Sequence, residues 1–281
     1  MCCLTQMGSP RPRMNHDHWL QRWPPRTPDP KAPVRVCVLA HYSSDHTLDL
    51  PLIHQLHYLT AVARVVLVTQ SRLSDHDAEF LQQHYCPHGV LRIPRSSGLD
   101  HTSYRAGVRH CARHLNDAAW LWLVNDSVYG PFASMAVWKT RIFNMENAGL
   151  AAWGMTNSFQ ITYHIQSYFR ALRKDVFQAP AFGAFLDKPW HTMDYWGVVR
   201  NGELAMFQEL LHPRRTSALR SAVPQDRSNP TFRHWLDVLR RAMIVKRKLV
   251  RRYPRLRRGI HAALRRAQMN PHHLEAWLRH L

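Results

Sequence analysis

A run of apolar residues from Trp120 to Val124 is the feature that most constrains the fold of this chain. Such a run is typical of a strand that is buried on both faces, as in the centre of a parallel sheet. The run leads directly into Asn125-Asp126-Ser127. Because ligands of open α/β sheets bind beyond the carboxyl ends of the strands, we expect Asp126 to face a ligand.

Strand and helix patterns alternate along most of the chain. Short apolar stretches are separated by segments in which apolar residues recur with helical spacing. This alternation favours a three-layer α/β/α sandwich with a mostly parallel central sheet. The expected strands cover residues 34–40, 65–69, 90–93, 120–124, 150–155 and 163–172.

Composition divides the chain into three parts. Residues 1–33 are rich in proline and arginine, and we expect them to be disordered. Residues 34–228 carry the alternating pattern and form the predicted domain. Residues 229–281 form a predicted basic helical extension that begins at Asn229-Pro230.

Positive charge is concentrated in this extension. The chain has a net charge of +19, and residues 238–274 contain twelve Arg or Lys residues without one Asp or Glu. Such a segment suits an anionic membrane surface, although a solvated helix face is the plainer alternative. We see no secretory signal, no transmembrane stretch and no motif that reads nucleic acid. The sequence therefore predicts a cytoplasmic protein, peripheral at the inner face of the cell membrane, that does not bind nucleic acid.

The position of Asp126 also indicates a metal site. A diphosphate leaving group needs its charge neutralised, and Mg²⁺ or Mn²⁺ held by one or two carboxylates does this. Asp126 would supply such a carboxylate. The alternative is that Asp126 only caps a helix or occupies a turn.

Other segments contain groups suited to a sugar nucleotide. Gly98 permits a tight turn and Asp100 could bind a ribose or base, although Asp100 is equally suited to cap a helix. Amides, hydroxyls and aromatic rings between residues 156 and 169 suit a sugar, although an edge strand without a ligand would show the same pattern. The candidates on this second segment are Asn157, Gln160, His164 and Gln166.

Transfer of a sugar with inversion also needs a general base beside the acceptor hydroxyl. Glu203 and Asp194 are the candidates, with His191 as a further one. Glu203 opens the helix predicted over residues 202–211, so it could instead be a favourable charge in the first helical turn.

Several segments taken together resemble the rhamnan synthesis protein F family of bacterial glycosyltransferases. The two specific ones are Asn-Asp-Ser-Val-Tyr-Gly-Pro, which ends at Pro131, and Tyr-His-x-Gln-Ser-Tyr-Phe, which ends at Phe169. Ala40-His41-Tyr42, the loop and helix over residues 92–107, and Asn229-Pro-Thr support them.

The resemblance implies a GT-A-like fold and transfer of a sugar from a nucleotide donor. It further implies dTDP-L-rhamnose as the donor and a lipid-linked glycan as the acceptor. Asp126 would correspond to the metal-binding aspartate, Gly98 and Asp100 to the nucleotide-side loop, and Glu203 to a glutamate ahead of a helix.

We therefore predict a metal-dependent glycosyltransferase of surface-polysaccharide assembly. His41, Tyr42 and Asn125, at the ends of two predicted strands, join Asp100 as candidates for binding the nucleotide sugar. A non-catalytic glycan-binding or scaffold protein on the same fold is the main alternative. Charge alone would suggest a nucleic-acid binder, which ranks below both because the sequence contains no motif that reads nucleic acid.

Overall fold

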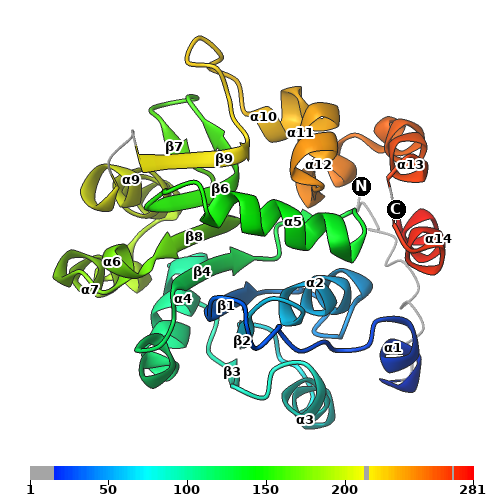
Figure 1. Cartoon of the computed structure of the whole chain (residues 1–281), viewed down its shortest axis with the longest axis horizontal. Coiled ribbons are helices and arrows are strands. Elements are labelled where there is room, and N and C mark those ends of the chain that lie inside the picture. The colour runs from blue at the N-terminus through cyan, green and yellow to red at the C-terminus, as the bar shows by residue number, and fades with distance from the viewer. Residues whose placement is uncertain (1–15, 212–214, 268) are drawn as a thin grey trace, which may run out of the picture.

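A computed structural model describes residues 16–211, 215–267 and 269–281 of the chain. Its centre is an eight-stranded sheet with the order β3-β2-β1-β4-β8-β6-β7 and with β9 beside β6 (Figure 1). β8 and β7 run against the other strands. The strands are β1 (Arg35–His41), β2 (Arg64–Thr69), β3 (Val90–Arg92), β4 (Trp120–Asn125), β6 (Ala152–Ser158), β7 (His164–Ile165), β8 (Phe169–Arg173) and β9 (Thr216–Arg220).

The strand predicted from Trp120 to Val124 is confirmed as a central one. Every residue of β4 is buried, because β4 pairs in parallel with β1 on one side and antiparallel with β8 on the other. Trp122 is fully buried and lies opposite Cys37 of β1. The stretch expected as one strand over 163–172 is instead two short strands, β7 and β8, each of which pairs with β6.

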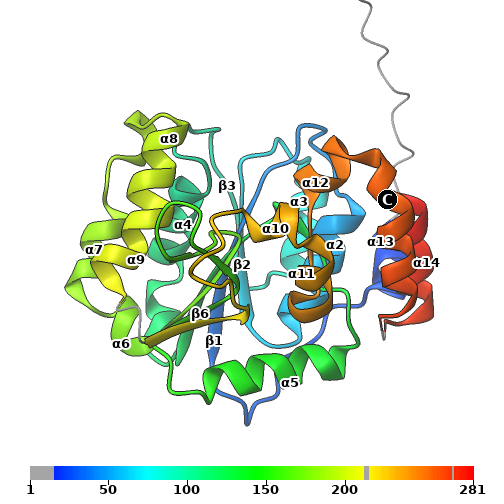
Figure 2. The same cartoon turned by 90° about the horizontal axis from the view of Figure 1, so that it is seen from above.

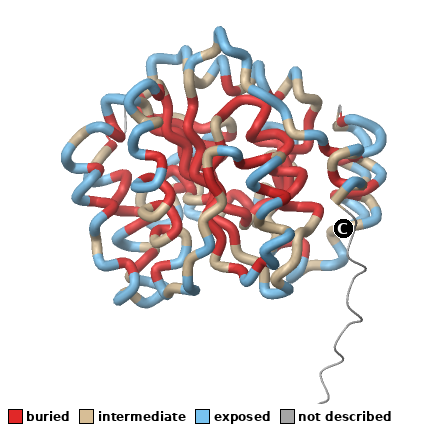
Figure 3. The backbone as a smooth tube through the Cα atoms, turned by 90° about the horizontal axis from the view of Figure 1, so that it is seen from below, coloured by how far each residue is buried: buried red, intermediate tan, exposed pale blue. Residues whose placement is uncertain are grey.

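Helices cover both faces of the sheet, so the predicted three-layer α/β/α sandwich with a mostly parallel sheet is confirmed (Figure 2). Buried side chains form one cluster on each face, and the buried backbone runs through the middle of the molecule (Figure 3). One face is covered by α2 (Leu50–Thr60), α3 (Asp75–His84) and α5 (Met135–Glu146). The other is covered by α4 (Leu99–His110), α6 (Lys174–Phe177), α7 (Pro180–Leu186) and α9 (Ala205–Leu210).

The N-terminal segment differs from the expected disorder in its described part. Helix α1 (His16–Arg22) buries Trp19, and Trp23 directly after it is fully buried. The ring of Trp23 stacks on His273, in the helix at the opposite end of the chain. Two tryptophans four residues apart lie on one side of a helix, and their apolar area outweighs the surrounding prolines and charges. Residues 24–33 of this expectation form neither helix nor strand, and residues 1–15 lie outside the described residues.

The C-terminal extension is helical, as predicted, and packs against the α5 side of the molecule. A two-residue strand, β10 (Val245–Lys246), pairs antiparallel with β5 (Val128–Tyr129). This pairing carries the extension to the residues that follow β4. Among the described helices, none combines the length and the apolar character that crossing a membrane requires. The helices are α10 (Pro230–Arg233), α11 (Trp235–Ala242), α12 (Arg247–Arg252), α13 (Arg257–Arg265) and α14 (Pro271–His280).

Candidate active site

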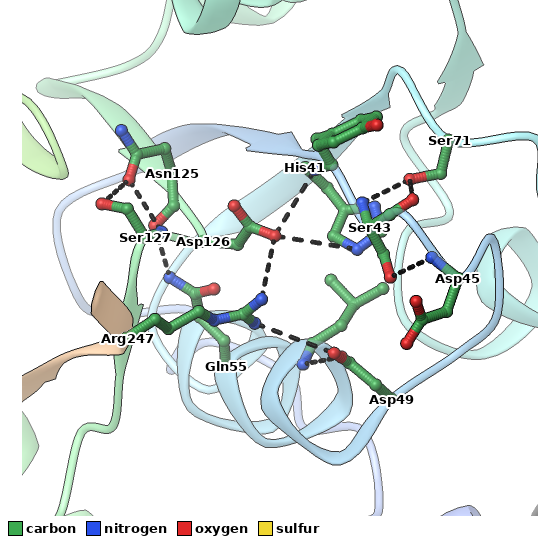
Figure 4. Close-up of polar contacts among 12 residues, drawn as sticks. His41, Ser43, Asp45, Asp49, Gln55, Ser71, Asn125, Asp126, Ser127 and Arg247 are labelled. Carbon is green, nitrogen blue, oxygen red and sulfur yellow. Dashed lines mark hydrogen bonds and ion pairs between the residues drawn. The ribbon is translucent and has the colours of Figure 1, made fainter. Parts of the chain in front are cut away.

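The candidate site lies where β1 and β4 end, side by side in the sheet. His41 is the last residue of β1 and Asn125 the last of β4. The backbone carbonyl of Asn125 accepts a hydrogen bond from Gln55 of α2 at 3.2 Å. This bond holds the end of β4, so that Asp126, the next residue, lies beside His41 at the edge of the sheet (Figure 4).

Asp126 is nearly buried among groups that stabilise a negative charge. Its Oδ2 atom accepts hydrogen bonds from the backbone N–H of Tyr42 and from Nη1 of Arg247, each at 3.4 Å. Nε2 of His41 lies 3.8 Å away, and burial lowers the pKa of this histidine. No described residue bonds to Oδ1 of Asp126, so this oxygen is open to a ligand.

Asp100 joins Asp126 at this site. Its Oδ2 atom accepts a hydrogen bond of 2.5 Å from Nδ2 of Asn125. Burial, and next the negative charge of Asp126, raise the pKa of Asp100 to about 6. Two carboxylates in a buried site disfavour each other's ionised form, and a cation bound between them relieves this repulsion.

Two basic residues at the site were not among the sequence candidates. Nζ of Lys246 donates a hydrogen bond of 2.9 Å to Oγ of Ser127, and Lys246 lies over the ring of Tyr168. Burial lowers the pKa of Lys246, while nearby acids oppose that shift. Arg247 lies next to Lys246 and contacts Asp126. Both belong to the basic segment that we expected at a membrane surface. The strand pairing that brings them to the site involves two residues only and cannot be recognised from the sequence around them.

Glu203 lies on the face of the sheet that α4 covers, in a π-helical turn (Val199–Leu204) that precedes α9. Its Oε1 atom accepts a hydrogen bond of 2.9 Å from the backbone N–H of Ser167 and lies 3.8 Å from Nε2 of His164. Glu203 is also near enough to Asp100 to contribute to the raised pKa of that group. Glu203 is therefore part of the same charged cluster, although the helix predicted over residues 202–211 begins earlier than expected.

Asp194 and His191 do not join this cluster. Asp194 is exposed and caps the short helix α8 (Tyr195–Val198), where Oδ1 accepts a hydrogen bond of 2.6 Å from the N–H of Gly197. His191 is exposed as well.

The other sugar candidates are partly engaged within the protein. Oδ1 of Asn157 accepts a hydrogen bond of 2.6 Å from the N–H of Ala222. Nε2 of Gln166 donates to Oδ1 of Asn229 at 3.3 Å. Both amides therefore hold the strand region together, which is the alternative to sugar binding given above. Gln160 is exposed and accessible to a ligand.

Gly98 is required by packing. A Cβ atom at this position would lie 2.3 Å from Oγ1 of Thr102 and 2.6 Å from Cβ of Trp190. Gly98 is the N-cap of α4, the place that Asp100 was suited to occupy. Asp100 lies instead in the first helical turn, from which it reaches Asn125.

The residues at the site suit a cation that keeps most of its own waters. Mg²⁺ and Mn²⁺ are commonly held by one or two carboxylates and the phosphates of the substrate. Asp126 offers an oxygen that no described residue binds, and the carboxylate of Asp100 lies near enough for the charge of Asp126 to act on it. The described residues bring three metal-binding side chains together at another place, where His16 of α1 meets His76 and Asp77 of α3.

The class of protein follows from the match to a family model. The model for rhamnan synthesis protein F matches residues 65–214, which is more than half of the chain. The chain therefore belongs to the rhamnan synthesis protein F family, and this membership supports glycosyltransferase function in polysaccharide synthesis. Asp100, Asp126 and Glu203 lie within the matched range, whereas Lys246 lies beyond it.

Among solved structures, the chain matches two glycosyltransferases at low identity. One is a glycosyltransferase involved in glycosylation of the major capsid of PBCV-1, with 11% identity and a TM-score of 0.39, over 76% of this chain and 93% of that one. Another is the mannosyltransferase Ktr4p from S. cerevisiae, with 9% identity and a TM-score of 0.36, over 70% and 74%. No curated protein matches the sequence.

Proposed function

We propose that this protein transfers a sugar from a nucleotide donor to a growing surface polysaccharide. The observation that carries the proposal is the charged cluster of Asp126, Asp100 and Glu203 beyond the carboxyl ends of β1 and β4, in a chain of this family. The sugar nucleotide would bind at this edge, where open α/β sheets hold their ligands. The family resemblance favours rhamnose from dTDP-L-rhamnose as the sugar, a lipid-linked glycan as the acceptor and a GT-A-like arrangement of the donor.

The diphosphate of the donor is the group that the cluster is best suited to bind. Asp126, with Asp100 beside it, would hold Mg²⁺ or Mn²⁺, which supplies a positive charge for the leaving diphosphate. Lys246 and Arg247 add two further positive charges at the same place. Preorganised charges of this kind stabilise a leaving group without having to reorient during the reaction.

Nucleotide recognition would use the ends of β1 and β4. The backbone N–H of Tyr42 and the side chain of Asn125 border Asp126, and the ring of Tyr42 lies under the guanidinium of Arg95 at 4.7 Å. An aromatic ring held in this way can stack on a base. His41 is fully buried and bonds to Thr69 through Nδ1, so its role would be to position Asp126.

Glu203 is the candidate for the general base. Its Oε1 atom is fixed by the N–H of Ser167, and Oε2 has no bond to a described residue. In the proposed reaction Glu203 takes the proton from the acceptor hydroxyl, the hydroxyl oxygen bonds to the sugar carbon, and the nucleoside diphosphate leaves with the bonding electron pair. Asp194 remains the second candidate.

A panel of sugar nucleotides tests the proposal. The purified protein is incubated with dTDP-L-rhamnose and with UDP- and GDP-sugars, with Mn²⁺ or with a chelator, and release of nucleoside diphosphate is measured. Metal-stimulated turnover of one donor is expected. Binding of glycan without turnover of any donor would instead favour the non-catalytic scaffold protein.

A further inference from the structure

An apolar groove lies between α5, α11 and α13, on the side of the molecule opposite α4 and α7. Its volume is about 530 Å³, within the range of about 300–1,000 Å³ typical of small-molecule sites. The floor and walls are apolar, and they include Trp235, Leu236, Met243, Ala262 and Ala263.

Three arginines surround this groove. Arg141 of α5, Arg240 of α11 and Arg266, the residue that caps the end of α13, all line it. Among the described residues, none forms a hydrogen bond or an ion pair with the guanidinium group of any of the three. Unpaired cations around an apolar groove complement a ligand that has a hydrocarbon chain and an anionic head. Residues 1–15, which contain two arginines and no acid, would not provide that complement.

The groove is also connected to the candidate active site. Met243 lines the groove, and three residues further on Lys246 donates to Ser127 beside Asp126. Three peptide units span at most about 11 Å. Phe132 also lines the groove, and its backbone N–H donates a hydrogen bond of 2.6 Å to the carbonyl of Met243. Residues 126–132 and 243–247 therefore both run from the groove to the candidate active site.

We propose that this groove binds one acyl chain of an anionic membrane phospholipid, with the lipid phosphate held by the three arginines. The basic extension would then do more than lie on a charged surface: it would hold individual lipid molecules and keep the active site at a fixed height above the bilayer. The proposal extends the peripheral membrane location expected from the sequence, and it does not depend on which sugar is transferred.

Vesicle binding tests the proposal with no sugar donor present, so that a failure of the proposed glycosyltransferase activity does not affect the result. The full-length protein is titrated with vesicles of equal phosphatidylglycerol and phosphatidylcholine, and with vesicles of phosphatidylcholine alone. Ala262→Glu places a carboxylate in the groove at an exposed position. Ala136→Glu, at an exposed position of α5 that does not line the groove, is its matched control.

Charge reversal is controlled in the same way. Arg240→Glu changes the groove, and Arg113→Glu makes the same change at an exposed position near the end of α4. We expect Ala262→Glu and Arg240→Glu to bind the anionic vesicles at least about tenfold more weakly than wild type. The two controls should stay within about twofold of wild type. Equal losses of vesicle binding for Arg240→Glu and Arg113→Glu would show that overall charge alone attracts the protein to the vesicles. That result would contradict lipid binding in the groove.

A second measurement reports on the groove without weakening the binding. Vesicles with phospholipids brominated on the acyl chain quench tryptophans that touch the hydrocarbon, and Trp235 lines the groove. We expect quenching of the wild-type protein that is largely lost in Trp235→Phe, while binding to unbrominated vesicles is kept. Quenching that is the same in both proteins would mean that the acyl chain lies elsewhere.

Discussion

Nη1 of Arg247 lies 3.4 Å from Oδ2 of Asp126, although 121 residues separate them along the chain. The pairing of β10 with β5 makes this contact possible. The C-terminal extension therefore completes the candidate active site, in addition to its place on the surface. Arg247 also lies 4.0 Å from Asp49, so one guanidinium holds two acids at the edge of the sheet.

Substitution of the two basic residues should lower turnover of the donor. Arg247→Ala and Lys246→Ala each remove a positive charge from the proposed diphosphate site, and turnover is expected to fall by about 10²–10³. Steady-state kinetics with the active sugar nucleotide measures this. Arg241→Ala is the control, because Arg241 is exposed and pairs with Asp237 in its own helix. Normal turnover by Arg247→Ala would exclude a role for this residue.

Glu203→Gln should lower turnover while leaving donor binding intact. The glutamine keeps an oxygen that accepts from Ser167 but cannot take a proton, so kcat should fall by about 10²–10⁴ with little change in KM for the donor. Asp194→Asn is the comparison, because asparagine also caps a helix and should preserve both stability and activity. If Asp194→Asn loses turnover and Glu203→Gln does not, the two assignments must be exchanged.

The raised pKa of Asp100 predicts a pH-dependent stability. The folded-state pKa of about 6 exceeds the ordinary value of 3.8, so folding favours the protonated form. This contribution is fully present below about pH 4 and is lost as the pH rises through 6, at a cost of up to about 3 kcal/mol. Urea unfolding from pH 4 to 8 should show a smaller decline for Asp100→Asn than for wild type. Parallel curves for the two proteins would contradict the shifted pKa.

Mn²⁺ should counteract that decline. A cation bound between Asp126 and Asp100 stabilises both ionised carboxylates, so added Mn²⁺ should raise the thermal midpoint at pH 7.5 and have less effect at pH 5. The double variant H16A/H76A is needed as a background, because His16 and His76 with Asp77 form a second possible metal site. Stabilisation that disappears in this background would belong to the second site.

The N-terminal helix should contribute to the stability of the whole molecule. Trp23 is fully buried, and its carbonyl accepts a hydrogen bond of 2.5 Å from the hydroxyl of Tyr85. Trp23→Ala is therefore expected to reduce the free energy of unfolding by about 3–5 kcal/mol. Gln21→Ala, at an exposed position of α1, should change it by less than about 0.5 kcal/mol. Equal stability of the two variants would mean that residues 16–23 are disordered, as the sequence alone predicted.

The central sheet was predictable because its signal is local. A strand that is buried on both faces must be apolar throughout, and β4 is. The position of Asp126 beyond β4 follows from that strand alone. The order of residues 16–23 could not be predicted because proline, arginine and histidine around Trp19 and Trp23 obscure the spacing of the two tryptophans.

The rest of the site could not be predicted because it depends on contacts between distant segments. Lys246 and Arg247 reach the site through a two-residue strand pair, and no periodicity marks so short a strand. Their positive charges were therefore assigned to the surface along with their neighbours. Asn157 lies in a segment whose composition suits sugar binding, yet its side chain accepts a hydrogen bond from Ala222. No pattern in the segment around Asn157 indicates this contact.

Asp126 is the residue on which the proposed metal and diphosphate site depends most directly, and donor turnover by Asp126 variants tests that role. The measurement is the release of nucleoside diphosphate by wild type, Asp126→Ala and Asp126→Asn, with Mn²⁺ in excess and with unchanged thermal unfolding as the criterion of folding. An essential role of Asp126 predicts that both variants lose at least about 10³-fold in turnover. Turnover by either variant at the wild-type rate would contradict it.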